Sequence, residues 1–409
     1  MRGVAPPRLR AAQAGISLVE TLVALVLGLA MVSVAFNLYV SNRAVFRQIE
    51  AMVRLQESGS IAAALLETSI RHAAGTLCRN KPPTTTLLNT PSPTTNTDYL
   101  QHNPPTPYAY WQRVDGRDGG LLGLHGYDSI QADPIVGVLR LAGDSISIMS
   151  DNMGKVARVT GPATHTSASD TGGLTGSYTF TVDNGLDFPV GTVAMACDYA
   201  RAVLFQVTYS EPTTITLHAG TGAPVVSPGN CAVTMRRPGG TDGVSAMDGD
   251  SSCYGGVDAQ KKSGQIYPFG PGSMIGEHTF HHWYIGKKTS TDACCSLRRF
   301  RATYSATGVG STDEEMVENV TDMQLTYLVG VLTTNYASRD YYLPQNDGTS
   351  KNMVRKLAKF PQVTAVRIVL TLTSPEKVGL AAQNKASAAT YTIPINVAIR
   401  ARMPGVVRR

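Results

Sequence analysis

The stretch Gly15-Ile16-Ser17-Leu18-Val19-Glu20-Thr21-Leu22 opens a long apolar segment of the chain. Residues 16–40 would form a helix about 37 Å long at about 1.5 Å per residue, which exceeds the thickness of a bilayer core, about 30 Å. Glu20 is the only charged residue in this segment, and a carboxylate deep in a membrane helix costs about 2.5–3.5 kcal/mol on insertion scales. The segment therefore predicts a membrane-spanning helix in which Glu20 has a role that offsets this cost.

The same helix is expected to continue beyond the membrane segment. Val45, Ile49 and Val53 recur at helical spacing among charged residues, so this part is predicted to be amphipathic. Glycine is common at the residue that ends a helix, and we expect the C-cap at Gly75. The sequence thus predicts one N-terminal helix over residues 16–75.

The rest of the chain, residues 76–409, predicts a β-rich domain. Alternation of apolar and polar residues predicts strands at 146–148, 178–182, 203–209, 279–284, 297–304, 323–329, 363–372 and 391–399. Two stretches without that alternation, 79–120 and 232–277, are rich in Pro, Thr or Gly, and we expect long loops there. One long helix followed by many strands predicts an α+β fold, with the amphipathic half of the helix packed on a large antiparallel β-sheet domain.

The charge of the chain limits the partners it can attract. The formal net charge is +6, and Arg2, Arg8 and Arg10 lie within the first fifteen residues, so their removal would leave +6 − 3 = +3. A charge this small gives no general argument for nucleic-acid binding, although clusters such as Arg298-Arg299 keep DNA as an alternative partner. Basic residues before an apolar segment also predict a cytoplasmic N-terminus.

The chain has six cysteines, at positions 78, 197, 231, 253, 294 and 295. An even number, in a chain with an N-terminal membrane segment, suggests disulfides and an oxidising compartment. Adjacent residues such as Cys294 and Cys295 have Cα atoms about 3.8 Å apart, closer than the roughly 4.4–6.8 Å of a usual bridge, so each is expected to have another partner. The connectivity stays open, but we expect Cys197 to pair with Cys231, because the two flank one predicted hairpin.

No arrangement of residues predicts catalysis. The chain has no Gly-x-Ser-x-Gly, His-Glu-x-x-His or phosphate-binding glycine motif, so we expect no enzyme and no cofactor. His278, His281 and His282 with the Cys294-Cys295 pair could hold zinc, but their spacing matches no standard motif, and His281 would point away from the other two in a strand. Aspartates within 242–250 could hold calcium, but the glutamate of an EF-hand is missing. A hairpin and a solvated loop are the simpler interpretations, and we expect no metal.

The opening stretch resembles the class III signal of type IV pilins, which prepilin peptidase cleaves after a glycine. The resemblance implies cleavage between Gly15 and Ile16, loss of the leader 1–15 and N-methylation of Ile16. It also implies an assembly contact in which Glu20 pairs with the terminal amine of a neighbouring subunit, so that two costly charges offset each other. The chain departs from the pattern at Ile16, where phenylalanine is common, and at Asn37, where major pilins often have a helix-breaking proline.

Later segments resemble the PilW-type minor pilins, a family related to the GspJ-type pseudopilins. These segments are Arg71–Gly75 with Cys78, Cys197–Thr208 with Gly229-Asn230 after it, Ser296–Arg299 with Met316–Tyr327, and Val363–Ser374. The long stretches at 79–120 and 232–277 depart from the family pattern.

The resemblance implies a structural minor pilin that primes the assembly of a type IV pilus or caps it. Its expected partners are prepilin peptidase, other minor pilins, the major pilin and a PilY-type tip adhesin. It would be a single-pass protein of the inner membrane with a periplasmic C-terminus before assembly, and would lie in the pilus, at the tip, afterwards. Two alternatives remain: a type II secretion pseudopilin of the GspJ kind and a DNA-binding minor pilin.

Overall fold

The computed structural model describes most of the helix and of the strands. The described residues are 17–75, 77–78, 84–86, 88, 114–115, 120–121, 123–129, 133, 135–167, 176–199, 201–219, 226, 229–230, 233, 268–287, 295–306, 308–329, 341–344, 353–354, 363–378 and 387–400. The chain divides into two compact units, one of Met1–Arg54 with Ser374–Ala389 and the other of Leu55–Thr373 with Thr390–Arg409.

The first unit contains the N-terminal part of α1 (Leu18–Arg71). Every residue from Leu18 to Val40 is exposed. Most of these residues are apolar, and they lie on all sides of the helix. Further along, Arg54 forms an ion pair with Glu50, one turn earlier, at 2.7 Å. A helix that is apolar all round needs an apolar surrounding, which a bilayer or other helices can provide.

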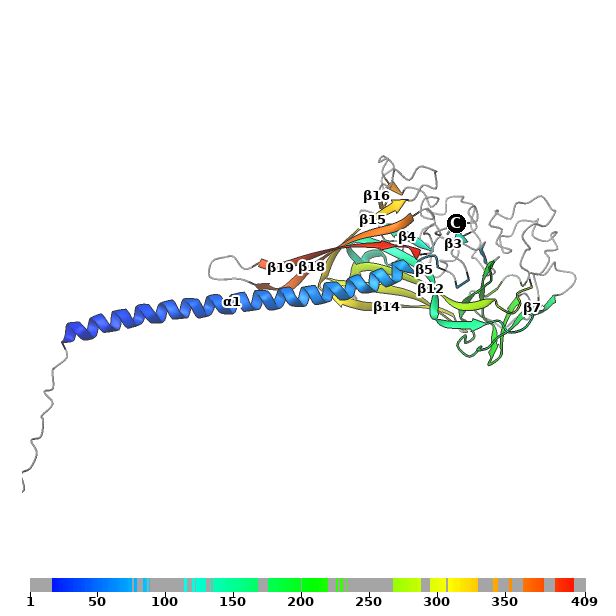
Figure 1. Ribbon diagram of the computed structural model, residues 1–409, viewed down its shortest axis with the longest axis horizontal. Helices are drawn as coiled ribbons and strands as arrows, with labels where there is room; N and C mark the ends of the chain where they lie inside the picture. Colours follow the sequence, from blue (N-terminus) through cyan, green and yellow to red (C-terminus); the bar gives the residue numbers. More distant parts are fainter. Residues whose placement is uncertain are drawn as a thin grey trace, which may run out of the picture. The chain divides into compact units, whose positions relative to one another are not determined.

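In the second unit the rest of α1 packs on strands. Its buried residues lie three or four positions apart, as one face of a helix requires. They are Leu55, Gly59, Ala62, Leu66 and Ile70. The second half of α1 runs beside β18 (Val363–Val378) and β19 (Ser387–Ala398) (Figure 1). A Cβ added at Gly59 would come within 2.3 Å of Ile393 Cδ1 and 3.4 Å of Leu372 Cδ1. The missing side chain of Gly59 therefore lets the helix approach these strands closely.

The largest sheet has eight strands arranged around β12 (Met274–Gly286). Its main path is β1 (Thr84–Thr86), β9 (Ala202–Gln206), β8 (Val193–Cys197), β12, β13 (Ser296–Ser305) and β14 (Gly308–Glu318). β5 (Arg140–Arg158) pairs with β12, and β4 (Leu124–Tyr127) pairs with β5. Because β8 pairs with residues 274–277 of β12 and β13 with residues 281–286, β8 and β13 follow each other along one edge of β12.

Three smaller sheets complete the described fold. The five-stranded sheet has the order β17 (Met353–Val354), β16 (Tyr341–Pro344), β15 (Val320–Val329), β18 and β19. The four-stranded sheet has the order β10 (Tyr209–Glu211), β11 (Thr214–Ala219), β7 (Gly176–Thr181) and β6 (Thr164–Ser167). In the two-stranded sheet β2 (Val114–Asp115) pairs with β3 (Gly120–Leu121). A short 3-10 helix, η2 (Gly137–Leu139), precedes β5. Among the pairings whose register is described, only β1–β9 and β16–β17 are parallel.

Aromatic rings join the four-stranded sheet to the eight-stranded one. Phe180 of β7 stacks on Phe205 of β9, with ring centroids 5.4 Å apart, and lies 5.8 Å from Phe269. All three rings are buried in one apolar cluster. Tyr178, Phe180 and Val182, which alternate along the chain, all enter this core, as the period of two predicts.

The predicted α+β fold is confirmed. The strands expected at 279–284, 297–304, 323–329 and 363–372 lie within β12, β13, β15 and β18. β12 nevertheless begins at Met274, inside a stretch predicted to be a loop. Its first residues pair with both β5 and β8, and a strand covered in this way need not alternate apolar and polar residues. Most of the predicted loops 79–120 and 232–277 lies outside the described residues.

Candidate functional site

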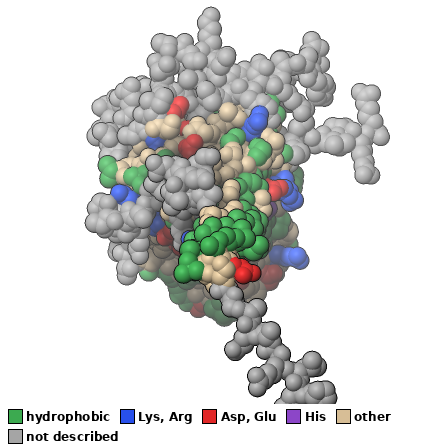
Figure 2. Space-filling view, turned by 90° about the vertical axis from the view of Figure 1, so that its left-hand side faces the viewer, with side chains coloured by type: hydrophobic (Ala, Val, Ile, Leu, Met, Phe, Trp, Pro, Cys, Tyr) green, Lys and Arg blue, Asp and Glu red, His purple; other side chains and the backbone are tan. Residues whose placement is uncertain are grey.

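The N-terminal part of α1 is the first candidate site, because it exposes a continuous apolar surface. Its most apolar window has a mean hydropathy of 2.3, none of that window is buried, and by length and composition the helix can cross a membrane. Figure 2 looks onto this end of α1, where hydrophobic side chains surround the helix. Over the described residues, α1 is thus a candidate membrane anchor.

Glu20 stands in the first turn of this helix. The carbonyl of Ser17 accepts hydrogen bonds from the backbone amides of Glu20, at 3.0 Å, and of Thr21, at 3.1 Å, so the helix begins directly after Ser17. The positive end of the helix dipole favours a carboxylate at this position. Glu20 is exposed and available to a partner, whereas the predicted cleavage residues Gly15 and Ile16 lie outside the described residues.

The C-terminal end of α1 is fixed to β5 rather than capped by Gly75. The helix ends at Arg71, and Ala74 rather than Gly75 has the left-handed conformation, with φ 57°. The Ala74 amide donates to Met149 O at 2.9 Å, and Gly75 O accepts from the Asp151 amide at 3.3 Å. These bonds to β5 hold Ala74 in a backbone conformation that favours glycine, which the local sequence pattern could not predict.

A disulfide joins the segment after the helix to β8. Cys78 is bonded to Cys197, with Cα atoms 5.7 Å apart and a sequence separation of 119 residues. The expected pair Cys197–Cys231 is therefore wrong. The neighbour of Cys231, Asn230, donates to and accepts from the backbone of Gln206. Gln206 pairs with Val193, which lies at the other end of β8 from Cys197. Four residues of strand span about 13 Å, so the contact of Asn230 with Gln206 lies far from Cys197. Cys295 is also in a disulfide.

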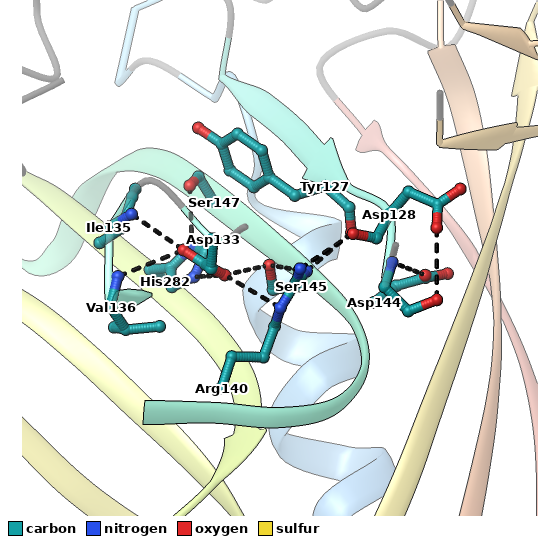
Figure 3. A network of polar contacts seen from close by, with 11 residues as sticks. Tyr127, Asp128, Asp133, Ile135, Val136, Arg140, Asp144, Ser145, Ser147 and His282 are labelled. Atoms are coloured by element: carbon teal, nitrogen blue, oxygen red, sulfur yellow. Dashed lines mark hydrogen bonds and ion pairs between the residues drawn. The ribbon is translucent and has the colours of Figure 1, made fainter. Parts of the chain in front are cut away.

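A second candidate site is a buried polar network between β5, β12 and the segment before η2 (Figure 3). His282 Nδ1 lies 2.9 Å from the Ser147 hydroxyl, and His282 Nε2 lies 3.0 Å from Asp133 Oδ2. Asp133 also accepts from the Ser145 hydroxyl and from the backbone amide of Ile135 at 2.9 Å. Burial alone would raise the pKa of the Asp133 carboxyl, but the charge and hydrogen bonds around it, above all those of His282, hold that pKa well below its usual range.

Ser147, His282 and Asp133 have the residue types of a hydrolase triad, but the arrangement does not suit catalysis. The exposed fraction is 0% for Ser147 and His282 and 3% for Asp133, so a substrate cannot reach the serine hydroxyl. A nucleophile must contact its substrate. The network therefore fixes the strands: it ties β12 to β5 and holds the turn at 133–136.

Two further buried carboxylates hold neighbouring segments together. Asp144 accepts from the backbone amides of Ser129, at 3.0 Å, and of Leu325, at 2.8 Å, and so joins β5 to β15. Burial raises the pKa of Asp144 to about 6. Asp151 accepts from the Leu77 amide at 3.1 Å and lies 2.8 Å from His278 Nδ1, and burial raises its pKa.

The histidines of β12 behave as structural residues. His278 and His282 lie opposite Asp151 and Ser147 of β5 and contact these residues on the same face. His281 is on the other face, where burial and two arginines lower its pKa to about 4. Within the described residues no group of three or more His, Cys, Asp and Glu could hold a metal ion, and Cys294 lies outside them.

Two neighbouring arginines of β13, Arg298 and Arg299, are neutralised by acids of β14. Arg298 is buried and lies 3.2 Å from Asp313 Oδ1, while Arg299 lies 2.5 Å from Glu314 Oε2 on the neighbouring strand. Cross-strand ion pairs of this kind leave little free positive charge for a phosphate backbone. The arginine pairs therefore do not favour the DNA-binding alternative.

The comparison with known protein families agrees with the quoted segments Ser296–Arg299, Met316–Tyr327 and Val363–Ser374. The family model of PilW, "Type IV Pilus-assembly protein W", matches residues 282–405. The match supports a PilW-family pilus protein. This matched segment includes β15, which Asp144 contacts, and β18 and β19, which lie against Gly59 of α1. PilW is a component of pilus assembly and not a known enzyme family. No curated protein and no solved structure matches the chain.

Proposed function

We propose that this chain is a minor pilin that primes the assembly of a type IV pilus or caps it. The observation that carries the proposal is the exposure of every residue of α1 from Leu18 to Val40, with a single carboxylate in the first turn. An apolar surface of this length is costly in water, at about 25 cal/mol per Å² of apolar area. A bilayer before assembly and neighbouring helices in the fibre afterwards would both cover it.

In this proposal the chain has three parts. The leader 1–15 is removed by prepilin peptidase, and the new N-terminal residue, Ile16, is methylated. The helix 16–75 anchors the protein through residues 16–40, and the domain 76–409 lies in the periplasm and then on the pilus, at its tip. Other minor pilins, the major pilin and a PilY-type adhesin are the proposed partners.

Glu20 is the proposed assembly contact. Its carboxylate has no counter-charge on the same helix for many residues, since the next charged residue along the described chain is Arg43. The terminal amine of a neighbouring mature subunit would supply that charge only after the leader has been cut. A close pair of opposite charges gains much in a medium of low dielectric constant, so the contact would set the register between subunits.

The family match supports the pilus rather than the type II secretion machine, because the matching model is that of a pilus-assembly protein. Glu20→Ala tests the assembly contact. The variant should still insert into the inner membrane but should be lost from sheared pili, whereas Glu50→Ala, which removes an exposed acid further along the same helix, should be incorporated normally. Normal incorporation of Glu20→Ala would overturn the proposed contact.

A further inference from the structure

One face of β12, β13 and β14 gathers polar side chains around a tryptophan. His281 lies opposite Arg301, and Arg301 lies opposite Thr312. Trp283, two residues from His281, lies opposite Arg299, which in turn lies opposite Glu314. Residues two apart in a strand and residues directly opposite share a face of the sheet. We name this set the β12–β14 cluster: His281, Trp283, Arg299, Arg301, Thr312 and Glu314.

The β12–β14 cluster has one positive charge in excess. Arg299 forms an ion pair with Glu314, and its guanidinium carbon lies 5.8 Å from the ring centroid of Trp283. Arg301 has no ion pair with any residue of the described chain. Burial and the two arginines lower the pKa of His281 to about 4, so the imidazole is neutral near pH 7. The charge of Arg301 is therefore not balanced within the cluster.

The same cluster holds hydrogen-bonding groups that have no partner in the described part of the chain. These are Trp283 Nε1, Arg301 Nε and Thr312 Oγ1, all buried. Trp283 is 0% exposed, and its Nε1–H and the Nε–H of Arg301 can only donate. Buried donors almost always have an acceptor, so these orphaned donors indicate an acceptor that lies outside the described residues. Arg301 and Thr312 are direct neighbours, and Trp283 is a diagonal neighbour within reach of a long side chain.

We propose that the β12–β14 cluster binds a small oxyanion, with a carboxylate as the best fit. Its oxygens would accept from Arg301 and Thr312, whose side chains are partly exposed, and its negative charge would balance Arg301. Arginine suits this role because its planar donors match the two oxygens of a carboxylate. The carboxylate can come from solution or from an Asp or Glu side chain of a neighbouring pilus subunit. The second source rests on the proposed function, whereas the first does not.

Tryptophan fluorescence tests the binding directly. The chain has two tryptophans, so Trp111→Phe leaves Trp283 as the only one. The full chain in detergent micelles would be titrated with sodium acetate and with sodium phosphate at constant ionic strength, chloride making up the difference. We expect a saturable change in Trp283 emission and a rise in the pKa of His281 at saturation. Arg301→Gln should raise the midpoint at least tenfold, whereas Arg367→Gln, at an exposed arginine of β18, should leave it unchanged.

A second arm separates the two sources of the carboxylate. A photo-cross-linking residue placed at Thr312 in piliated cells should form an adduct with another pilus subunit if a subunit supplies the group. Saturable binding without an adduct assigns the site to a free anion. If neither anion gives a saturable response and no adduct forms, the proposal is overturned and the orphaned donors are hydrated. Should Arg301→Gln fail to fold, the titration would be repeated with Thr312→Val, which replaces only the hydroxyl with a methyl group and should also raise the midpoint.

Discussion

Loss of the Cys78–Cys197 disulfide should destabilise the β domain strongly. The bond closes a loop of 119 residues between the end of α1 and β8. For a loop of that length the chain-entropy model gives a stabilisation of about 5 kcal/mol. Cys78→Ser and Cys197→Ser should therefore lower the free energy of unfolding by similar amounts, up to that value, because either substitution opens the same loop.

The pairing itself can be read from free thiols. Each variant would be unfolded in denaturant without reductant, alkylated and analysed by peptide mass spectrometry, since the folded protein buries Cys197. Cys78→Ser should make Cys197 available for alkylation. Cys231→Ser is the matched control, because it removes the partner that the sequence suggested, and Cys197 should remain protected in it.

Two results would refute this reasoning. If Cys231→Ser, and not Cys78→Ser, releases the Cys197 thiol, the pairing is wrong. If Cys78→Ser releases the thiol but leaves the free energy of unfolding unchanged, the bond does not constrain the unfolded chain as assumed. Only the first outcome would remove the covalent link between the end of α1 and β8.

Three further predictions concern the second unit. Burial raises the pKa of Asp144 from 3.8 to about 6. The stability that this carboxyl contributes is therefore fully present below pH 3.8 and is lost as the pH rises through about 6. Asp144→Asn should make the free energy of unfolding less dependent on pH over that range. Gly59→Leu should cost about 1–3 kcal/mol by overpacking, whereas Gly28→Leu, with no atom within 4 Å of its Cβ, should leave the melting of the β domain unchanged. Asp133→Ala should cost about 3–5 kcal/mol in denaturant unfolding, because it leaves a buried histidine without its partner; a loss below about 1 kcal/mol would contradict the structural role of the network.

Periodicity revealed the elements of the fold that bury one face. The helix and the strands β12, β13, β15 and β18 follow from spacings of about 3.6 and 2 residues, which depend only on which side of an element is apolar. The end of α1 was misjudged, because bonds to β5 hold Ala74 in the conformation expected of Gly75. Contacts from a distant strand thus outweighed a reliable local rule.

The buried polar groups could not be predicted. Asp133 and His282 are 149 residues apart, and Asp144 meets the Leu325 amide across 181 residues. No local pattern marks a carboxylate that will be buried against a remote strand. The Cys197–Cys231 expectation failed for the same reason, since nearness along the chain was used in place of the strand register. The residues of the N-terminal signal are contiguous, so the signal is read without the fold, and its cleavage and methylation stay predictions.

Mass spectrometry of the protein in sheared pili tests the minor-pilin role most directly. The predicted result is a mature chain that begins at N-methylated Ile16 and copurifies with the fibre in small amounts. A chain that still begins at Met1, or one that stays in the inner membrane and is absent from the fibre, would contradict it.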